Sequence, residues 1–136
     1  MKDLSRKALM LWDSSDDEDP REIFAVDYVN HQEPDAEGGV THNGLDDYVH
    51  IVQGHRKAFG WSEVTILMQV AEKDLVATRW RFDVTHTGDY LGHAATGRDV
   101  WTGIQIDRHK DGRNVESWVD WDKFRMLQSL GFIDAE

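Results

Sequence analysis

The sequence contains no cysteine. Disulfide bonds, zinc–thiolate sites and cysteine nucleophiles are therefore excluded. It also lacks any continuous apolar run of the length needed to cross a bilayer, and its first residues do not have the pattern of a signal peptide. We therefore expect a cytoplasmic protein with no membrane anchor.

Positive charge is scarce. Lys and Arg number 15 against 26 Asp and Glu, which gives a formal net charge of −11. An acidic surface repels phosphate backbones and anionic lipid surfaces. Neither a nucleic acid nor a membrane is therefore expected as a partner.

The composition is that of a globular protein, with 40% hydrophobic and 30% charged residues. A chain of 136 residues has the size of one ordinary domain, so we expect a single domain over 1–136. Six Trp is a high count for this length. Large rings fill wide spaces such as a ligand cavity.

Helical spacing dominates the first half of the chain. Apolar residues predict one helix over 4–12, a second over 23–29, and a third between Asn43 as N-cap and Gly60 after its last turn. The acidic run Ser14–Asp19 precedes the second helix, where Asp19 can serve as N-cap and Pro20 as the first helical residue. This run is either a solvated loop that caps the helix or an acidic motif for phosphorylation or protein binding.

Alternation of apolar and polar residues begins after Gly60. It predicts strands over 64–70, 76–84, 100–108 and 115–121, with turns at 72–74 and at Asp111–Gly112 and a short final helix. Helices followed by an antiparallel meander predict an α+β fold, in which a curved sheet wraps around the N-terminal helices and leaves a hollow. The glycine-bearing link Thr85–Asp99 either rims that hollow or merely closes a hairpin or packs on a second subunit.

Several short motifs in the second half have a familiar order and spacing. They are Arg79-Trp80, Thr85-His86-Thr87-Gly88, Thr96-Gly97-Arg98, Thr102-Gly103-Ile104 with Arg108, Asp111-Gly112, 116–122 and 127–131. Through them the segment 76–131 resembles the SnoaL-like polyketide cyclases, also called predicted ester cyclases. The first half resembles the family more loosely, through 28–31 and Ala58-Phe59.

The resemblance implies a cone-shaped fold of the nuclear transport factor two type, often paired as a homodimer through its sheet. It implies a pocket that needs no cofactor. It also implies an acidic residue near the end of the last strand, which removes a proton next to a carbonyl so that the enolate closes a ring by intramolecular aldol addition.

Asp122 matches that acidic residue, and we expect it to be the catalytic base. Apolar walls from Trp118 and Trp121 would raise the pKa of its carboxyl and suit it to proton abstraction near neutral pH. Asp120 would share the strand face of Trp118 and Asp122 and could hold a proton together with Asp122. The structural alternatives are that Asp122 caps the last helix and that Asp120 faces solvent or an arginine.

Two further residues are candidates for the site. His31 could donate a hydrogen bond to a substrate carbonyl, or it could be satisfied by backbone. Arg108 stands where characterised cyclases place a histidine, and it could stabilise an enolate or form an ion pair with Glu116 or Asp122. We expect the substrate pocket to include Trp118, Trp80, Ile106, His86 and Phe59.

No metal site is expected, because the histidine spacing does not fit one; His50 and His55, for instance, diverge on a helix. The leading hypothesis is a cofactor-free cyclase or isomerase that acts on a hydrophobic carbonyl compound. The alternatives are a ligand-binding or dimerisation module without catalysis, and hydrolysis by a water held between carboxylates.

Overall fold

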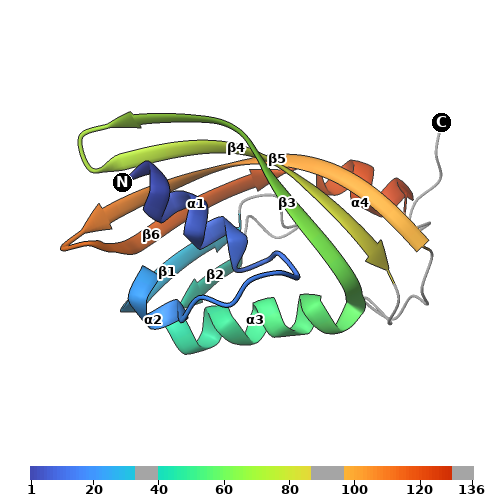
Figure 1. Ribbon diagram of the computed structural model, residues 1–136, viewed down its shortest axis with the longest axis horizontal. Helices are drawn as coiled ribbons and strands as arrows, with labels where there is room; N and C mark the ends of the chain where they lie inside the picture. The colour runs from blue at the N-terminus through green and yellow to red at the C-terminus, as the bar shows by residue number, and fades with distance from the viewer. Residues whose placement is uncertain (33–39, 87–96, 130–136) are drawn as a thin grey trace.

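The computed structural model describes residues 1–32, 40–86 and 97–129, and its centre is one curved six-stranded sheet (Figure 1). The strands are β1 (Phe24–Gln32), β2 (Val40–Asn43), β3 (Phe59–Glu72), β4 (Leu75–His86), β5 (Gly97–Lys110) and β6 (Arg113–Trp121). They lie in the order β2-β1-β6-β5-β4-β3. Only β1 and β6 run parallel, and every other neighbouring pair is antiparallel.

The helices are α1 (Lys2–Met10), α2 (Pro20–Ile23), α3 (Leu45–Ala58) and α4 (Lys123–Ser129). Helices α1 and α3 lie beneath the arch of the sheet, while α4 packs on β5 (Figure 1). The α+β prediction, with a curved sheet around N-terminal helices and a short C-terminal helix, is confirmed.

Two local predictions are confirmed by contacts. The Asp19 carboxylate accepts a hydrogen bond from the Arg21 amide at 3.0 Å, and Pro20 is the first residue of α2. Asp111 and Gly112 both have positive φ, 52° and 74°, in the tight turn between β5 and β6. A turn of this hand matches the twist of the strands on either side of it.

The predicted helix over 23–29 is wrong. Helix α2 ends at Ile23, and Phe24–Gln32 forms strand β1. Tyr28 and Asn30 are fully buried on one face of β1, whereas Asp27 is exposed on the other. The helix α3 is capped by Gly44, at φ 93°, rather than by Asn43, which ends β2.

Two hydrophobic clusters hold the layers together. One joins Ile23, Phe24, Tyr28, Leu45, Tyr48 and Val52 between α2, α3 and β1. The other lies on the concave face of the sheet and contains Phe59, Val64, Trp80, Phe82, Val84, Trp101 and Val119. The second cluster is rich in large rings, and the functional candidate described next lies against it.

Candidate functional site

A cavity of about 240 Å³ is lined by residues of the concave face of the sheet and of helices α1 and α3. Its lining comes from all six strands, from the two helices and from the first residue of α4. A mostly apolar cavity with a few polar groups is the usual form of a small-molecule site. The lining divides into an aromatic end and a polar end.

The aromatic end follows from the sheet register. Trp101 on β5 is the partner of Phe82 on β4, and Phe82 is the partner of Val64 on β3, so all three face the cavity side by side. The rings of Phe82 and Trp101 meet edge to face, with centroids 5.5 Å apart. Trp121 on β6 adds a tilted contact at 5.9 Å from Trp101. Such ring pairs stabilise the fold by more than the burial of their apolar surface alone.

Gly103 lets this wall close. It lies on β5 between Trp121 and Trp80, its partners on the two neighbouring strands. A Cβ at position 103 would lie 2.7 Å from the Cβ of Trp121 and 2.8 Å from Cε2 of Trp80. The absence of a side chain therefore allows the Trp80 indole to lie directly against Gly103.

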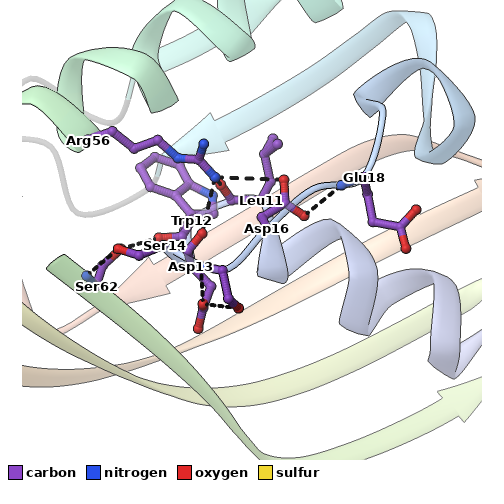
Figure 2. Close-up of polar contacts among 9 residues, drawn as sticks. Leu11, Trp12, Asp13, Ser14, Asp16, Glu18, Arg56 and Ser62 are labelled. Atoms are coloured by element: carbon purple, nitrogen blue, oxygen red, sulfur yellow. Dashed lines mark hydrogen bonds and ion pairs between the residues drawn. The ribbon is translucent and has the colours of Figure 1, made fainter.

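Trp12 forms the wall opposite the sheet, and Arg56 of α3 holds the segment that carries it (Figure 2). The Trp12 indole donates to the Tyr48 hydroxyl at 2.8 Å. Arg56 Nη2 donates to the carbonyl oxygens of Leu11 at 2.5 Å and Asp13 at 3.1 Å. The same guanidinium lies 3.7 Å from the Asp16 carboxylate, and burial raises the pKa of Asp16 above its ordinary value.

The polar end begins one step further along the strands. Gln32 on β1, Val119 on β6 and Gln105 on β5 are register partners in one row, and all three line the cavity. Gln105 Nε2 donates to the Asp107 carboxylate at 2.7 Å. A carboxylate only accepts, so this bond fixes which way the Gln105 amide points.

The next row is polar and closed to solvent. Asn30, Ser117 and Asp107 are register partners across β1, β6 and β5, and each is completely buried. The Ser117 hydroxyl donates to the Asp107 carboxylate, and Asn30 Nδ2 donates to the Tyr28 hydroxyl at 2.9 Å. Burial raises the pKa of Tyr28 well above its ordinary value, so it stays a neutral phenol. Buried hydrogen bonds of this kind hold neighbouring side chains in one arrangement, while Asp107 Oδ2 has no hydrogen-bond partner among the described residues.

Two histidines line the cavity. His55 on α3 lies against the ring of Trp12, with centroids 4.9 Å apart, and burial lowers the pKa of His55 to about 4. His42 ends the row of Asn30 and lies on β2 with Nδ1 3.4 Å from the Asp47 carboxylate. Lys123 completes the polar groups of the lining.

Asp122 and Asp120, the expected base and its partner, lie outside this cavity. Both side chains are exposed. Asp122 caps α4, because its carboxylate accepts a hydrogen bond from the Arg125 amide at 3.0 Å. Both residues border a shallow depression beside Arg79 and Thr102. The expectation that indole rings shelter these carboxylates is therefore corrected: the helix cap was the right alternative for Asp122.

His31, Arg108 and Trp118 lie together on the outer face of the sheet. His31 Nε2 lies 2.7 Å from Glu116 Oε2, and Arg108 Nη1 lies 3.2 Å from Glu116 Oε1. The Trp118 ring stacks on His31 at 5.5 Å, and the Arg108 guanidinium lies over it at 5.1 Å. The alternative reading of Arg108, an ion pair with Glu116, is the one that the structure shows.

The expected pocket residues fall in different places. Trp80 lines the cavity. Phe59 is buried behind the lining, against His55 and Trp101. Trp118 and Ile106 face outward, because they alternate with the inward residues Ser117 and Val119 of β6 and Gln105 and Asp107 of β5, and Ile106 is 40% exposed. His86 ends β4, and its side chain lies outside the described part of the structure, as do residues 87–96 of the expected pocket rim.

Of the described lining residues, Trp80 was expected in the pocket, whereas the polar residues Gln32, His42, His55, Gln105 and Lys123 were missed. One signal could have found Gln105. Trp101, Gly103 and Gln105 share one face of β5, so a strand whose tryptophan faces inward must carry that glutamine inward too. Among the described residues, no cluster of three or more His, Asp or Glu could hold a metal ion, and no helix is long and apolar enough to cross a membrane.

The fold and the cavity define a small-molecule pocket protein built on a curved α+β sheet. A family model, SnoaL-like polyketide cyclase, matches residues 2–130. The chain belongs to this family, which confirms the resemblance in its sequence. No curated protein matches the chain.

Solved structures agree with this assignment. IdmH from Streptomyces antibioticus, a proposed polyketide cyclase, is 31% identical over 96% of this chain and 97% of its own, with a TM-score of 0.80. AclR from Streptomyces galilaeus, a proposed hydroxylase, is 26% identical over 100% of this chain and 85% of its own, with a TM-score of 0.78. TsrD from Streptomyces laurentii has the same fold at 20% identity over 97% and 95% of the two chains, with a TM-score of 0.79.

Proposed function

We propose that this protein is a cofactor-free enzyme that removes a proton beside the carbonyl group of a hydrophobic, polyketide-like compound. Membership of the SnoaL-like family supports a small-molecule pocket enzyme. The observation that carries the proposal is the two-ended cavity, with Trp80, Trp101 and Trp121 at one end and Gln32 and Gln105 at the other. A flat apolar compound that carries a carbonyl group at one end fits this division.

The reaction is one proton transfer followed by a choice of product. A base takes the proton from the carbon next to the carbonyl, and the electron pair of that C–H bond moves onto the carbonyl oxygen as an enolate. Attack of the enolate on a second carbonyl of the same molecule closes a ring. Return of the proton to another carbon gives an isomer instead. Both outcomes need a site that positions the substrate and keeps bulk water away from the enolate.

Solvent exchange tests the proposal without knowledge of the natural substrate. The protein is incubated in D₂O with 1-tetralone, an aromatic bicyclic ketone, and loss of the proton beside its carbonyl is followed by NMR. Exchange well above the buffer rate, saturable in ketone, is the expected result. Quenching of tryptophan fluorescence measures binding in the same samples.

A non-catalytic binding module is the second candidate, and the positions of Asp120 and Asp122 favour it, since both expected catalytic carboxylates lie outside the cavity. The same experiment separates the two functions. Saturable quenching by the ketone with no exchange above buffer would reject the enzyme and leave a ligand carrier.

We also propose that a second copy of this chain covers the outer face of the sheet. Ile104 and Ile106 are 49% and 40% exposed there, beside the half-buried Trp118. Exposed apolar side chains grouped on one face are typical of an interface.

A charged substitution, Ile106→Glu, should convert a dimer to a monomer in sedimentation analysis. Val26→Glu, at a residue 84% exposed on β1, is the matched control and should leave the dimer intact. A wild-type protein that sediments as a monomer would reject the dimer.

A further inference from the structure

His42 joins the cavity to a carboxylate outside it. It lies on β2, where its register partner on β1 is Asn30, and its side chain is only 13% exposed. It lines the polar end of the cavity. Gln32 also points to this face of β1, two residues beyond Asn30, so His42 and Gln32 are diagonal neighbours across the two strands.

Asp47 lies behind the imidazole. It belongs to the first turn of α3, and its Oδ2 is 3.4 Å from His42 Nδ1. Its side chain is 51% exposed, so the carboxylate faces solvent while the ring it contacts faces the cavity. A carboxylate at Nδ1 favours the tautomer that carries its proton there. The lone pair of a neutral imidazole is then on Nε2.

The other proton-accepting groups of the cavity lining, and the two aspartates expected as base, are less well placed. Asp122 caps α4 and is exposed, and Asp120 lies on the outer face. Burial lowers the pKa of His55 to about 4, which makes it a weak base, and its ring packs against Trp12 and Phe59. Lys123 carries an ammonium group, which is no base while it is protonated.

We propose that His42 is the base of the reaction, that its Nε2 takes the proton from the carbon beside the substrate carbonyl, and that Asp47 positions its ring. This inference rests on the proposed function. The C–H bond breaks, an N–H bond forms on Nε2, and the electron pair moves to the carbonyl oxygen. The imidazolium then returns its proton, either to the ring-closed alkoxide or to carbon, so the protein ends in its starting state.

The polar row explains how the substrate would face this base. Gln32 and Gln105 lie on either side of Val119 in the row next to His42. The rings of Trp80, Trp101 and Trp121 occupy the opposite end. A substrate with its rings against the tryptophans therefore brings its carbonyl end to the glutamines and to His42.

The test measures exchange of 1-tetralone in D₂O for wild-type protein and four variants. We expect His42→Gln to lower the exchange rate constant by about 100-fold or more, the usual contribution of a general base, with ketone affinity within about threefold of wild type. Imidazole added to His42→Ala should restore part of the rate. Asp47→Asn should lower the rate constant without a change in affinity. Asp46→Asn, which removes the same charge one residue earlier in the same turn, is the matched control and should leave it unchanged.

The outcomes separate the two proposals. Binding without exchange by the wild-type protein rejects the proposed function itself. Exchange by the wild-type protein that persists in His42→Gln rejects His42 as the base and leaves the proposed function standing. Loss of exchange that imidazole does not restore in His42→Ala overturns the proton-transfer role and makes His42 a binding residue. An equal loss in Asp46→Asn and Asp47→Asn overturns the positioning role of Asp47.

Discussion

Asp122 Oδ1 accepts a hydrogen bond from the backbone amide of Arg125 at 3.0 Å. The aspartate that matches the acidic residue of the family therefore serves as the N-cap of α4. The backbone amide of Asp122 in turn donates to the Thr102 carbonyl at 2.9 Å, which ties the start of α4 to β5. The cap explains why this side chain turns away from the cavity although its neighbour Trp121 lines it.

A cap and a base respond differently to substitution. Asp122→Asn should keep both stability and solvent exchange, because Asn is an equally good N-cap. Asp122→Ala should lower the free energy of unfolding by about 1 kcal/mol, the usual cost of a lost cap, with exchange intact. Urea denaturation and the 1-tetralone assay check the two expectations. A folded Asp122→Asn protein that no longer exchanges the ketone proton would return this residue to the role of base.

The sequence predicted the antiparallel half of the sheet better than the rest. Strands β3 to β6 alternate clearly, and the turns between β3 and β4 and between β5 and β6 have recognisable sequences, so local information is enough. Strand β1 was mistaken for a helix, because in so short a segment its apolar residues fit the helical and the alternating period equally well. Its parallel partner β6 also lies far away along the chain, since His31 and Glu116, which are in contact, are 85 residues apart.

The site was harder to predict, for a reason that β6 makes plain. Trp118 and Trp121 differ by three positions, so they lie on opposite faces of the strand, and each could have faced inward on hydrophobicity alone. The inward face is decided by the neighbouring strands, which bring Val119 into one row with Gln32 and Gln105. The resemblance to the family was enough to predict the fold and the kind of pocket. Which residues line the pocket depends on how the strands pair, and this pairing could not be read from the sequence.

The cavity wall depends on the missing side chain at Gly103. We expect Gly103→Ala to lower the free energy of unfolding by about 1–3 kcal/mol, because the new methyl group overlaps the Trp80 indole and the Trp121 side chain. Ketone binding, measured by tryptophan quenching, should weaken as the two rings shift.

Gly54 offers the control for that substitution. It lies within α3, and a Cβ there would meet nothing within 4 Å. Gly54→Ala should raise the free energy of unfolding by about 0.5–1 kcal/mol, because Ala has the higher helix propensity. If Gly103→Ala matched Gly54→Ala in stability and ketone binding, the close approach of Trp80 to β5 would be wrong.

Arg56 should matter for both stability and binding, because it holds the segment that places Trp12 over the cavity (Figure 2). Arg56→Met keeps much of the side-chain length but removes the donors to the Leu11 and Asp13 carbonyls. We expect the free energy of unfolding to fall by about 1–3 kcal/mol and the affinity for the ketone to fall. Lys57→Met, at the exposed next residue of α3, is the control and should change neither. Equal effects of the two substitutions would show that general charge, not this contact, is responsible.

His55 should make the protein sensitive to acid. Burial lowers its pKa in the folded protein to about 4, from an ordinary value of 6.5. Between these values the unfolded chain binds a proton that the folded protein does not, so the free energy of unfolding falls as the pH falls through this window. The stabilisation is complete above pH 6.5, and the loss towards pH 4 is on the order of 3 kcal/mol.

Thermal and urea denaturation at pH 7.5 and pH 4.5 measure this loss. The carboxylates titrate in every variant, so the comparison is of the difference between the two pH values. His55→Gln should be less stable than wild type at pH 7.5, because the Gln side chain replaces a ring packed against Trp12, but it should lose less stability on acidification. His50→Gln, at an exposed position of the same helix, should follow the wild-type difference. A His55→Gln protein that loses as much stability in acid as the wild type would mean that the His55 ring takes up its proton in the folded state as readily as in the unfolded chain.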